Sequence, residues 1–374
     1  MGGGVIGTSI AWHLARRGGK VTLIERDGFA AQASGASAGG VRQLGRDPRE
    51  MPLAIASIRR WQTLEAELEA DVEFRAGGQL RVAERESDAP VLKQQAADHQ
   101  ALGLDIRFVE GDELHHIAPN LAPGIEWGIH TSNDGQASAP LTTKAFAAAA
   151  ERAGARLLTG TDVTRIVHRG GRVSGLDTTA GPIACDWLII AAGTWSAPLA
   201  SQLGVTLPLT TMALQMMAVG PFDPVLALTV GAVGRRLSLK QSPNGLFVIG
   251  GGWPGDLDST QRAGTTRLAS IRGSIEHASA ILPLLGRLPL QRTWVGLEAL
   301  AIDEIPIIGS LPGTENVTVA AGFSGHGFAL SPIVGQLISE LILNGAPSIP
   351  LDAFGYDRFA SLPANAQFPA WHAG

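Results

Sequence analysis

Cysteine and positive charge are both scarce in this sequence. The single cysteine, Cys185, excludes an internal disulfide and predicts a reducing compartment, the cytoplasm. The 29 Lys and Arg residues are outnumbered by 34 Asp and Glu, so the net charge is −5. No basic stripe is available to neutralise phosphates, and we expect no nucleic-acid partner. Since no apolar run reaches about 18 residues and no charged leader is visible, we expect no transmembrane segment.

Histidine is present but not in a metal-binding pattern. The nine histidines show no ligand spacing with cysteine or carboxylates, so we expect no metal site. Glycine, in contrast, is abundant at 47 residues, which predicts many tight turns or close backbone approaches to a ligand. A chain of 374 residues is long enough for two or three domains with a sizeable core.

The first residues carry a nucleotide-binding pattern. In "MGGGVIGTSIAWHLARRGGKVTLIER", Gly2, Gly4 and Gly7 spell the G-x-G-x-x-G loop that wraps a pyrophosphate. Apolar residues at helical spacing follow, and "KVTLIER" predicts a strand. This strand ends in Glu25, eighteen residues after Gly7. An acid at roughly 20 residues from the loop meets a ribose hydroxyl. The alternative for Glu25 is a solvated strand end.

A strand normally precedes this loop, yet only Met1 does here. Such a strand is central and buried on both faces of a parallel sheet. Losing its ladder, at roughly 1 kcal/mol per hydrogen bond, would consume much of a typical stability of about 5–15 kcal/mol. We therefore expect the natural protein to begin several residues upstream with a Val/Ile-rich strand, which an intact-mass measurement of the native protein would test.

Three later segments carry glycine-rich turns. In "AAQASGASAGGVRQLGR", Ser34 and Ser37 can donate to phosphate oxygens, unless the segment is a solvated linker. A hairpin around 170–171 leads to an apolar strand, Trp187–Ala192, that ends at Gly193. Strand ends of this kind lie where ligands bind in an α/β sheet. Cys185, at the head of that strand, is expected to pack rather than react.

The C-terminal third predicts a strand, a turn and a helix. "NVTVAAG" predicts the strand, and a glycine-rich turn over 322–327 follows it. Ser331 and Pro332 are suitable as N-cap and first residue of the helix, which Asn344 and Gly345 close. The start of a helix carries partial positive charge and free N–H groups.

Taken together, these segments resemble one known family. The glycine loop with "VTLIER", "GASAGGVRQ", "GRVSGLDTTAG…CDWLIIAAGTWS" and "GLEALAIDEIPIIG…VAAGFSGHGF" resembles the FAD-dependent D-amino-acid oxidase superfamily. Within it, the branch of sarcosine oxidase, glycine oxidase and dimethylglycine dehydrogenase is the most similar. The match runs in order from Gly2 to about Phe359.

The resemblance implies the α/β fold class, with a Rossmann-like FAD-binding domain and a second, mixed-sheet α+β substrate domain. The FAD-binding domain is expected to be discontinuous, over 1–72, 141–200 and 295–374, and the substrate domain to cover 73–140 and 201–294. Val163 would meet the adenine through its backbone, and 325–328 would line the isoalloxazine. The residues expected to bind FAD are Gly2, Gly4, Val5, Ile6, Gly7, Glu25, Arg26, Ser34, Ser37, Gly40, Val41, Val163, Gly193, Trp195, Gly325, His326, Gly327 and Phe328.

The departures from the family pattern concern its active-site side chains. Gly296 stands about where sarcosine oxidases carry the cysteine that links to the flavin, so we expect non-covalent FAD. Glu298 replaces the arginine with which glycine oxidases grip the substrate carboxylate. Ala329 replaces one sarcosine oxidase lysine, and the oxygen-activating lysine falls near Val248. Its loss favours a dehydrogenase over an oxidase.

Three residues are expected to act on the substrate: Arg42, Lys240 and Glu298. Arg42 matches an arginine of the sarcosine oxidase pattern, with Arg46 near a second, and either can pair bidentately with a carboxylate. The alternative is that Arg42 covers the flavin or forms a surface ion pair. Lys240, in "LSLKQ", is a second candidate anchor. Glu298 would bind a cationic amine or pair with an arginine, while His326 is expected to contact the flavin.

The resemblance implies oxidation of the C–N bond of a small amine or amino acid by hydride transfer to flavin N5. Sarcosine, glycine, a D-amino acid, a proline-type ring, an opine and iminodiacetate all fit, and the electron acceptor is O2 or another compound. A homo-oligomer or a hetero-complex is possible. Two alternatives stay open: a flavin-bearing subunit of a larger amine dehydrogenase complex, and a nicotinamide-dependent Rossmann dehydrogenase.

Overall fold

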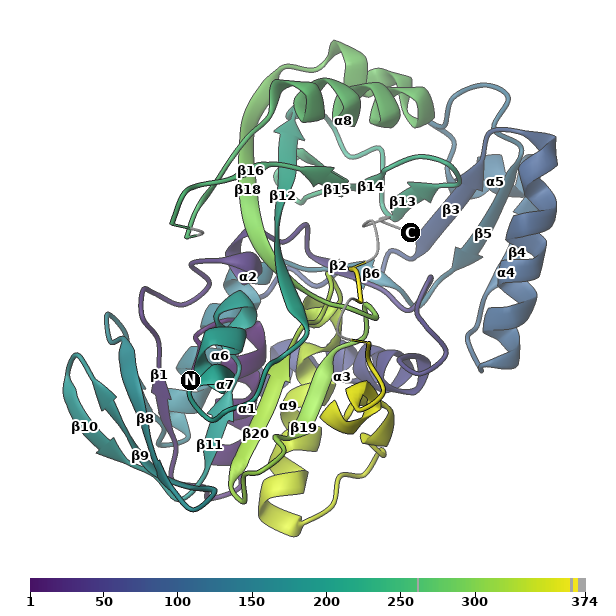
Figure 1. The fold of residues 1–374 in the computed structure, drawn as a ribbon. Coiled ribbons are helices and arrows are strands. Elements are labelled where there is room, and N and C mark those ends of the chain that lie inside the picture. Colours follow the sequence, from purple (N-terminus) through teal and green to yellow (C-terminus); the bar gives the residue numbers. More distant parts are fainter. Residues whose placement is uncertain (261, 364–365, 369–374) are drawn as a thin grey trace.

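The computed structural model describes residues 1–260, 262–363 and 366–368, and its elements form two parts (Figure 1). One part is built on an eight-stranded mixed sheet. The other packs helices against small parallel sheets. The strand order of the large sheet is β18 (Leu290–Ala301), β12 (Leu209–Val219), β15 (Phe247–Pro254), β14 (Ser238–Gln241), β13 (Thr229–Ala232), β3 (Gln79–Ala83), β5 (Trp127–Thr131) and β4 (Arg107–Glu110).

The large sheet has one apolar face and one polar face. Alternate residues such as Leu80, Leu239 and Ile249 join one buried core with Ala278 and Ile281 of α8 (Leu268–Ile281), which covers that face. The intervening residues, among them Lys240, therefore point to the opposite face, because side chains alternate along a strand. That opposite face is turned toward the second part of the molecule (Figure 1).

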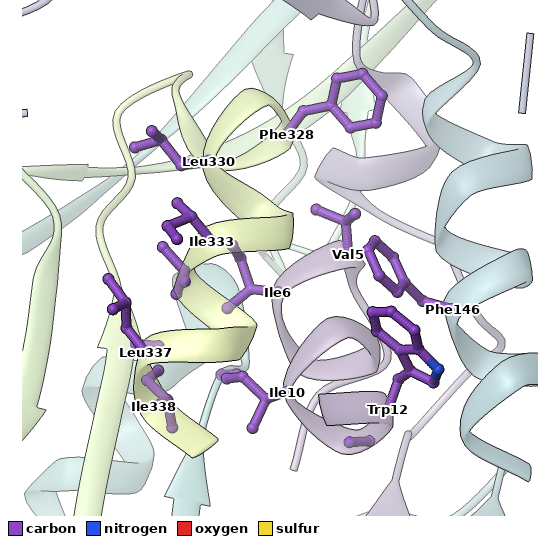
Figure 2. Packing of buried hydrophobic residues seen from close by; sticks show 14 of the residues in the cluster. Val5, Ile6, Ile10, Trp12, Phe146, Phe328, Leu330, Ile333, Leu337 and Ile338 are labelled. Carbon is purple, nitrogen blue, oxygen red and sulfur yellow. The ribbon is translucent and has the colours of Figure 1, made fainter. Parts of the chain in front are cut away.

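The second part centres on α1 (Val5–Ala15), of which all eleven residues are buried. This helix is enclosed because it packs between α6 (Ala139–Arg152) and α9 (Gly327–Asn344). Burial of each large apolar side chain of α1 contributes about 1.5–3 kcal/mol. Figure 2 shows the packed side chains of the three helices: Val5, Ile6, Ile10, Trp12, Phe146, Phe328, Leu330, Ile333, Leu337 and Ile338.

Two small sheets flank the start of the chain. In one, β1 (Thr22–Ile24) runs parallel to β7 (Arg156–Leu158). In the other, β20 (Val317–Ala321) pairs in parallel with β11 (Leu188–Ile190) and antiparallel with β19 (Ile307–Ser310). The Gly2 N–H donates to the Ile24 carbonyl (2.9 Å), and the Met1 carbonyl accepts from the Ala191 N–H (2.9 Å). Met1 and Gly2 therefore join the two sheets by main-chain hydrogen bonds.

The remaining elements of the described residues surround these parts. They are α2 (Ala33–Ala36), β2 (Gly40–Val41), α3 (Met51–Leu68), α4 (Ala89–Ala101), α5 (Asp112–Ile117), β6 (Gly135–Gln136), β8 (Val163–Arg169), β9 (Arg172–Thr178), β10 (Gly181–Ala184), α7 (Ser196–Ser201), β16 (Asp256–Leu257), β17 (Gly264–Thr265) and short 3₁₀ turns. The α/β class with a second, mixed-sheet part is thus confirmed. The domain bounds proposed from the sequence stay a prediction.

Most locally signalled elements are confirmed. The first helix and strand, the hairpin of β8 and β9, and the strand–turn–helix near the C-terminus are all present. The predicted strand over Trp187–Ala192 is shorter, at Leu188–Ile190.

The predicted start of the last helix is wrong. The helix α9 begins at Gly327, and Pro332 lies inside it. Pro332 has no N–H to donate to the Phe328 carbonyl, one turn earlier. The Ser331 hydroxyl donates to that carbonyl instead (2.9 Å), so the helix continues through the proline.

The helix α9 is also the one helix among the described residues that is long and apolar enough to cross a membrane. Its most apolar 18-residue stretch is 67% buried inside the protein. Its composition is thus accounted for by its central place in the core.

Candidate functional site

A long groove with about 1270 Å³ of empty space, including its open mouth, separates the glycine loop from the turn before α9. Its walls come from three parts of the chain, within 1–37, 161–199 and 297–328. The predicted cofactor-binding residues that line it are Gly2, Gly4, Val5, Ile6, Glu25, Arg26, Ser34, Ser37, Val163, Gly193, Trp195, Gly325, Gly327 and Phe328. Glu298 lines it as well, whereas Gly7, Gly40, Val41, His326, Arg42 and Lys240 do not.

The glycine loop leaves no room for side chains. A Cβ on Gly7 would lie 1.9 Å from the Gly2 carbonyl oxygen, and a Cβ on Gly2 would lie 2.2 Å from the Ala191 carbonyl oxygen. Gly2 also has φ +106°, a left-handed conformation that favours glycine. Gly7 therefore lets α1 start directly on the loop, and the first residues of the helix, Val5 and Ile6, line the groove. The start of a helix suits an anionic pyrophosphate.

Two polar side chains are fixed beside this loop. The Glu25 carboxylate accepts the N–H of Gly3 (2.5 Å) and of Asp27 (2.7 Å). The Ser34 hydroxyl accepts the N–H of Val5 (2.9 Å), at the first turn of α1. Main-chain donors therefore place the acid at the end of β1 and a hydroxyl at the helix start, both on the groove wall.

A flat cation–aromatic stack forms another part of the wall. The Arg26 guanidinium lies 4.5 Å from the centre of the Trp195 ring and pairs with Asp27 at 3.2 Å. Val163 lines the same groove. A planar, partly apolar surface of this kind suits a flat ring system.

At the other end, the turn before α9 meets β18. The Gly325 N–H donates to Glu298 Oε1 (3.0 Å). Burial raises the pKa of Glu298 to about 7, and the hydrogen bond from Gly325 opposes part of that rise. Glu298 thus faces the groove as a carboxyl that exchanges its proton near neutral pH.

Next to this turn, outside the groove lining, lie two neighbouring arginines, of which Arg46 is buried and Arg42 half-buried. Arg46 is 4% exposed, and its Nε donates to the Arg42 carbonyl (3.3 Å), while its Nη1 has no partner within the described part of the chain. The Arg42 Nη1 donates to the Leu44 carbonyl (3.1 Å). Burial, and then the charge of Arg42, lowers the pKa of Arg46 to about 9. Neither guanidinium has a salt bridge to a described carboxylate.

His326 takes part in this cluster. Its Nδ1 lies 2.9 and 3.0 Å from the two carboxylate oxygens of Glu50, which is fully buried. Burial, followed by the charge of Arg46, lowers the pKa of His326 to about 4, although Glu50 acts in the opposite direction. The imidazole ring is therefore turned toward Glu50 rather than into the groove.

Lys240 lies on β14, on the sheet face opposite α8. It is 8% exposed, and its Nζ donates to the Ala137 carbonyl at 3.4 Å. Burial lowers the pKa of Lys240 to about 8. Its amine also abuts Gly39, next to the β2 strand that contains Gly40 and Val41. Across the ladder it faces Val248 of β15.

Sequence reasoning missed two buried acids, Glu50 and Asp134. Asp134 accepts the N–H of Gln43 (2.8 Å), the Gln43 side-chain amide (3.0 Å) and the N–H of Leu44 (3.1 Å). It therefore fixes the backbone between the two arginines. Neither acid lies in a motif. Glu50 ends the charge-rich stretch "VRQLGRDPRE", which is the sequence signal near it, and Asp134 lies outside that stretch.

The groove fits a dinucleotide with flat rings at both ends. The helix start and the glycine loop suit its phosphates, Glu25 suits a ribose, and the stack of Arg26 on Trp195 suits a planar group. The groove then continues to the start of a second helix, α9, which favours negative charge on a second ring system.

Comparisons with known proteins agree with this fit. Residues 1–341 match the model of the DAO family, described as FAD dependent oxidoreductase. The glycine oxidase of Geobacillus kaustophilus is 28% identical over 367 residues, covering 96% of both chains. The sarcosine oxidase subunit beta of Rhizobium meliloti is 25% identical over 366 residues, covering 96% of this chain and 87% of the relative. The crystal structure of L-proline dehydrogenase from P. horikoshii matches with a TM-score of 0.90 at 26% identity, covering 96% of each chain.

The resemblance that the sequence motifs indicate is confirmed by these matches. The family match, over more than nine tenths of the chain, favours FAD over the nicotinamide alternative. The chain belongs to the DAO family of FAD-dependent oxidoreductases, and FAD is the cofactor of this enzyme.

Proposed function

We propose that this enzyme oxidises the C–N bond of a small amino acid or secondary amine. The observation that carries the proposal is the pair of buried Arg46 and half-buried Arg42 beside the turn before α9. Buried charges are costly unless they are paired. A substrate carboxylate would supply the missing partner. The names of the relatives, glycine oxidase, sarcosine oxidase subunit beta and L-proline dehydrogenase, support an amine or amino acid.

The charges around the pair support a substrate with one carboxylate. Arg81, on the same face of the large sheet as Lys240, is close enough to Arg42 to have its pKa lowered by it. Arg42 and Arg46 both interact with two buried carboxylates, Glu50 and Asp134, and Arg81 interacts with Arg42. The cluster carries a net charge of about +1 when all five groups are ionised. One bound carboxylate would neutralise it.

FAD, when bound, accepts a hydride from the carbon next to the amine, and the imine so formed hydrolyses to an oxo acid and an amine. The residues that line the groove, from Gly2 to Trp195, would hold its nucleotide, and those from Gly325 to Phe328 its ring end. We propose that the binding is non-covalent, because the single cysteine, Cys185, does not line the groove.

The arginines would orient the substrate. Anchoring the carboxylate fixes the C–H bond toward the ring end of the groove, and such placement is worth about 7–11 kcal/mol of the barrier in favourable cases. Glu298, on the groove wall, would hold the proton that the amine gives up, because its pKa lies near 7. Lys240, whose pKa lies near 8, is the candidate for a second contact with an anionic group.

Among the amines that fit, a proline-type ring gains support from the structure of L-proline dehydrogenase, and sarcosine and glycine from the other two relatives. An acceptor other than O2 is proposed, because Val248 replaces the oxygen-activating lysine of the sarcosine oxidase pattern. A role as one subunit of a larger complex is the second candidate, which the match to a sarcosine oxidase subunit favours. A cytoplasmic location belongs to the same proposal.

The test is anaerobic reduction of the bound flavin. Glycine, sarcosine, D-alanine, D- and L-proline, an opine and iminodiacetate are added in turn to the purified holoenzyme, and the loss of flavin absorbance is followed. Bleaching by at least one compound is expected, with slower reduction in an Arg42→Met variant. If no amine or amino acid bleaches the flavin while dithionite does, the proposed function is wrong. Turnover with a dye acceptor and gel filtration then separate a self-sufficient enzyme from a subunit.

A further inference from the structure

A carboxylate–imidazole pair joins the arginine segment to the cofactor turn. Glu50 lies directly before α3, eight residues after Arg42, and His326 is the N-cap residue of α9. Both oxygens of Glu50 lie within 3.0 Å of His326 Nδ1, although 276 residues separate the two in sequence. The role of Glu50 is not explained by the packing of α3, since a buried carboxylate there is costly without a partner.

The contact with Glu50 favours one tautomer of the imidazole. An ionised carboxylate only accepts, so Nδ1 beside it carries the hydrogen and donates it. The ring is neutral at ordinary pH because burial keeps its pKa low. Its Nε2 is therefore a hydrogen-bond acceptor. No described residue hydrogen-bonds to Nε2, and the side chain is 16% exposed, so this acceptor is left free for another group.

The free acceptor lies in the same cluster as the arginine pair. The charges of Arg46 and Arg42 both act on His326, which places the guanidiniums near the ring. The residues on either side of it, Gly325 and Gly327, line the cofactor groove. The two arginines, which can donate hydrogen bonds to a carboxylate, and the acceptor Nε2 of His326 therefore lie close together beside the ring end of the groove. An amino acid carries the complementary groups, a carboxylate and an N–H, a few ångströms apart.

We propose that Glu50 is a positioning residue that holds His326 as the Nδ1–H tautomer, so that Nε2 accepts a hydrogen bond from the substrate amine while the arginines hold its carboxylate. This inference rests on the proposed function. It assigns His326 the task of holding the amine by one N–H, so that the nitrogen lone pair is oriented toward the reacting carbon. The neutral imidazole does not remove the proton itself, which leaves that task to Glu298 or solvent.

The first measurement needs no substrate. The histidines of the holoenzyme are labelled with ¹⁵N, and the resonances of His326 are assigned by their loss in His326→Gln. The ring nitrogens of the wild type should show a protonated Nδ1 and a bare Nε2 at pH 8. In Glu50→Gln the amide can donate as well as accept, so the Nε2–H tautomer should become populated. Glu65→Gln is the matched control, because Glu65 accepts main-chain N–H groups of Val72 and Phe74 away from the site.

The second measurement uses a substrate from the reduction panel. In Glu50→Gln, kcat/KM should fall about 10-fold or more, the scale seen when a partner that orients an imidazole is removed. The FAD content should stay unchanged, and Glu65→Gln should keep wild-type kcat/KM. Glu50→Asp keeps the charge, but its shorter side chain moves the carboxylate oxygens away from His326. It should lose less activity than Glu50→Gln.

Two results would overturn the inference. One is a wild-type His326 that carries its hydrogen on Nε2 or is doubly protonated at pH 8. The other is a Glu50→Gln variant whose melting temperature changes while its tautomer and kcat/KM do not. Failure of the proposed function looks different: no amine reduces the wild-type flavin although the Nδ1–H tautomer is observed, and only the substrate half of the inference is then lost.

Discussion

Substitution of Gly7 by alanine gives the sharpest test of the cofactor groove. The new Cβ would lie 1.9 Å from the Gly2 carbonyl oxygen and 3.1 Å from its carbon. The loop and the helix must therefore separate by roughly 1 Å, since a contact this short is never tolerated. The helix cannot move freely, because α6 and α9 enclose it on both sides. The loop moves instead, and with it the main-chain bond from Gly2 to Ile24.

The magnitude follows from the cost of overpacking. Inserting a methyl group into a filled space costs about 1–3 kcal/mol. If about 2 kcal/mol of this appears in cofactor binding, the dissociation constant of FAD rises roughly 30-fold. Equilibrium dialysis of FAD against the apoprotein measures this constant, and a melting curve of the apoprotein measures the remainder. The matched control is Gly286→Ala, where the nearest atom to the new Cβ is the hydroxyl of Ser279 at 3.3 Å, far from the groove. Wild-type FAD affinity in Gly7→Ala, with the control equally unaffected, would refute the assignment of the loop.

Three further substitutions test the charged groups. Arg46→Met removes a buried cation with an unpartnered Nη1, so the melting temperature should stay the same or rise. KM for the substrate should rise about 30-fold, which corresponds to a loss of roughly 2 kcal/mol of binding free energy. A lower melting temperature with unchanged KM would contradict this. Glu298→Gln removes a group whose folded-state pKa, about 7, lies above the unfolded value of about 4.3. Wild-type stability should therefore fall relative to this variant as pH rises from about 4.5 to 7, which denaturant unfolding at pH 5 and pH 8 measures. Lys240→Met removes an amine whose pKa is lowered to about 8, so the variant should be the more stable protein at pH 7. That advantage should shrink as pH rises from about 8 to 10.5, because the buried lysine then loses its charge; a gap that widens instead would refute the burial argument.

The parts of the fold that could be predicted are those with a local signal. The spacing of Gly2, Gly7 and Glu25 predicts the loop, the helix and the acid because all three belong to one continuous loop, helix and strand, ending in β1. The turn before α9 could be predicted equally well, since a strand, glycines and a helix follow one another in the sequence. The start of α9 was misplaced because Ser331 and Pro332 satisfy the rule for a helix start. That rule does not reveal that the Ser331 hydroxyl can donate to the Phe328 carbonyl, which receives no hydrogen bond from the proline.

The charged cluster could be predicted only in part. The resemblance indicates Arg42 and Arg46, but it does not indicate the nearby Glu50, which pairs with His326. Glu50 contacts a residue 276 positions away, His326. The local sequence does not show that this carboxylate is buried, and burial is what makes it notable. Asp134 likewise acts through the backbone of Gln43 and Leu44, a contact that no spacing rule describes. Residues that contact main-chain groups far away in the sequence follow no regular spacing by which they could be recognised.

The segments that line the groove lie far apart along the chain. A ribosome that adds roughly 5–20 residues per second completes the first segment, which ends near Ser37, well before it begins the last, which starts at Leu297. The interval is about 13–52 s. Newly made protein therefore cannot enclose its flavin until the segment after Leu297 has been made, and contacts this distant in sequence are slow to form. Retained yellow colour thus reports that these distant segments have packed together, so flavin content measures the fraction of correctly folded enzyme.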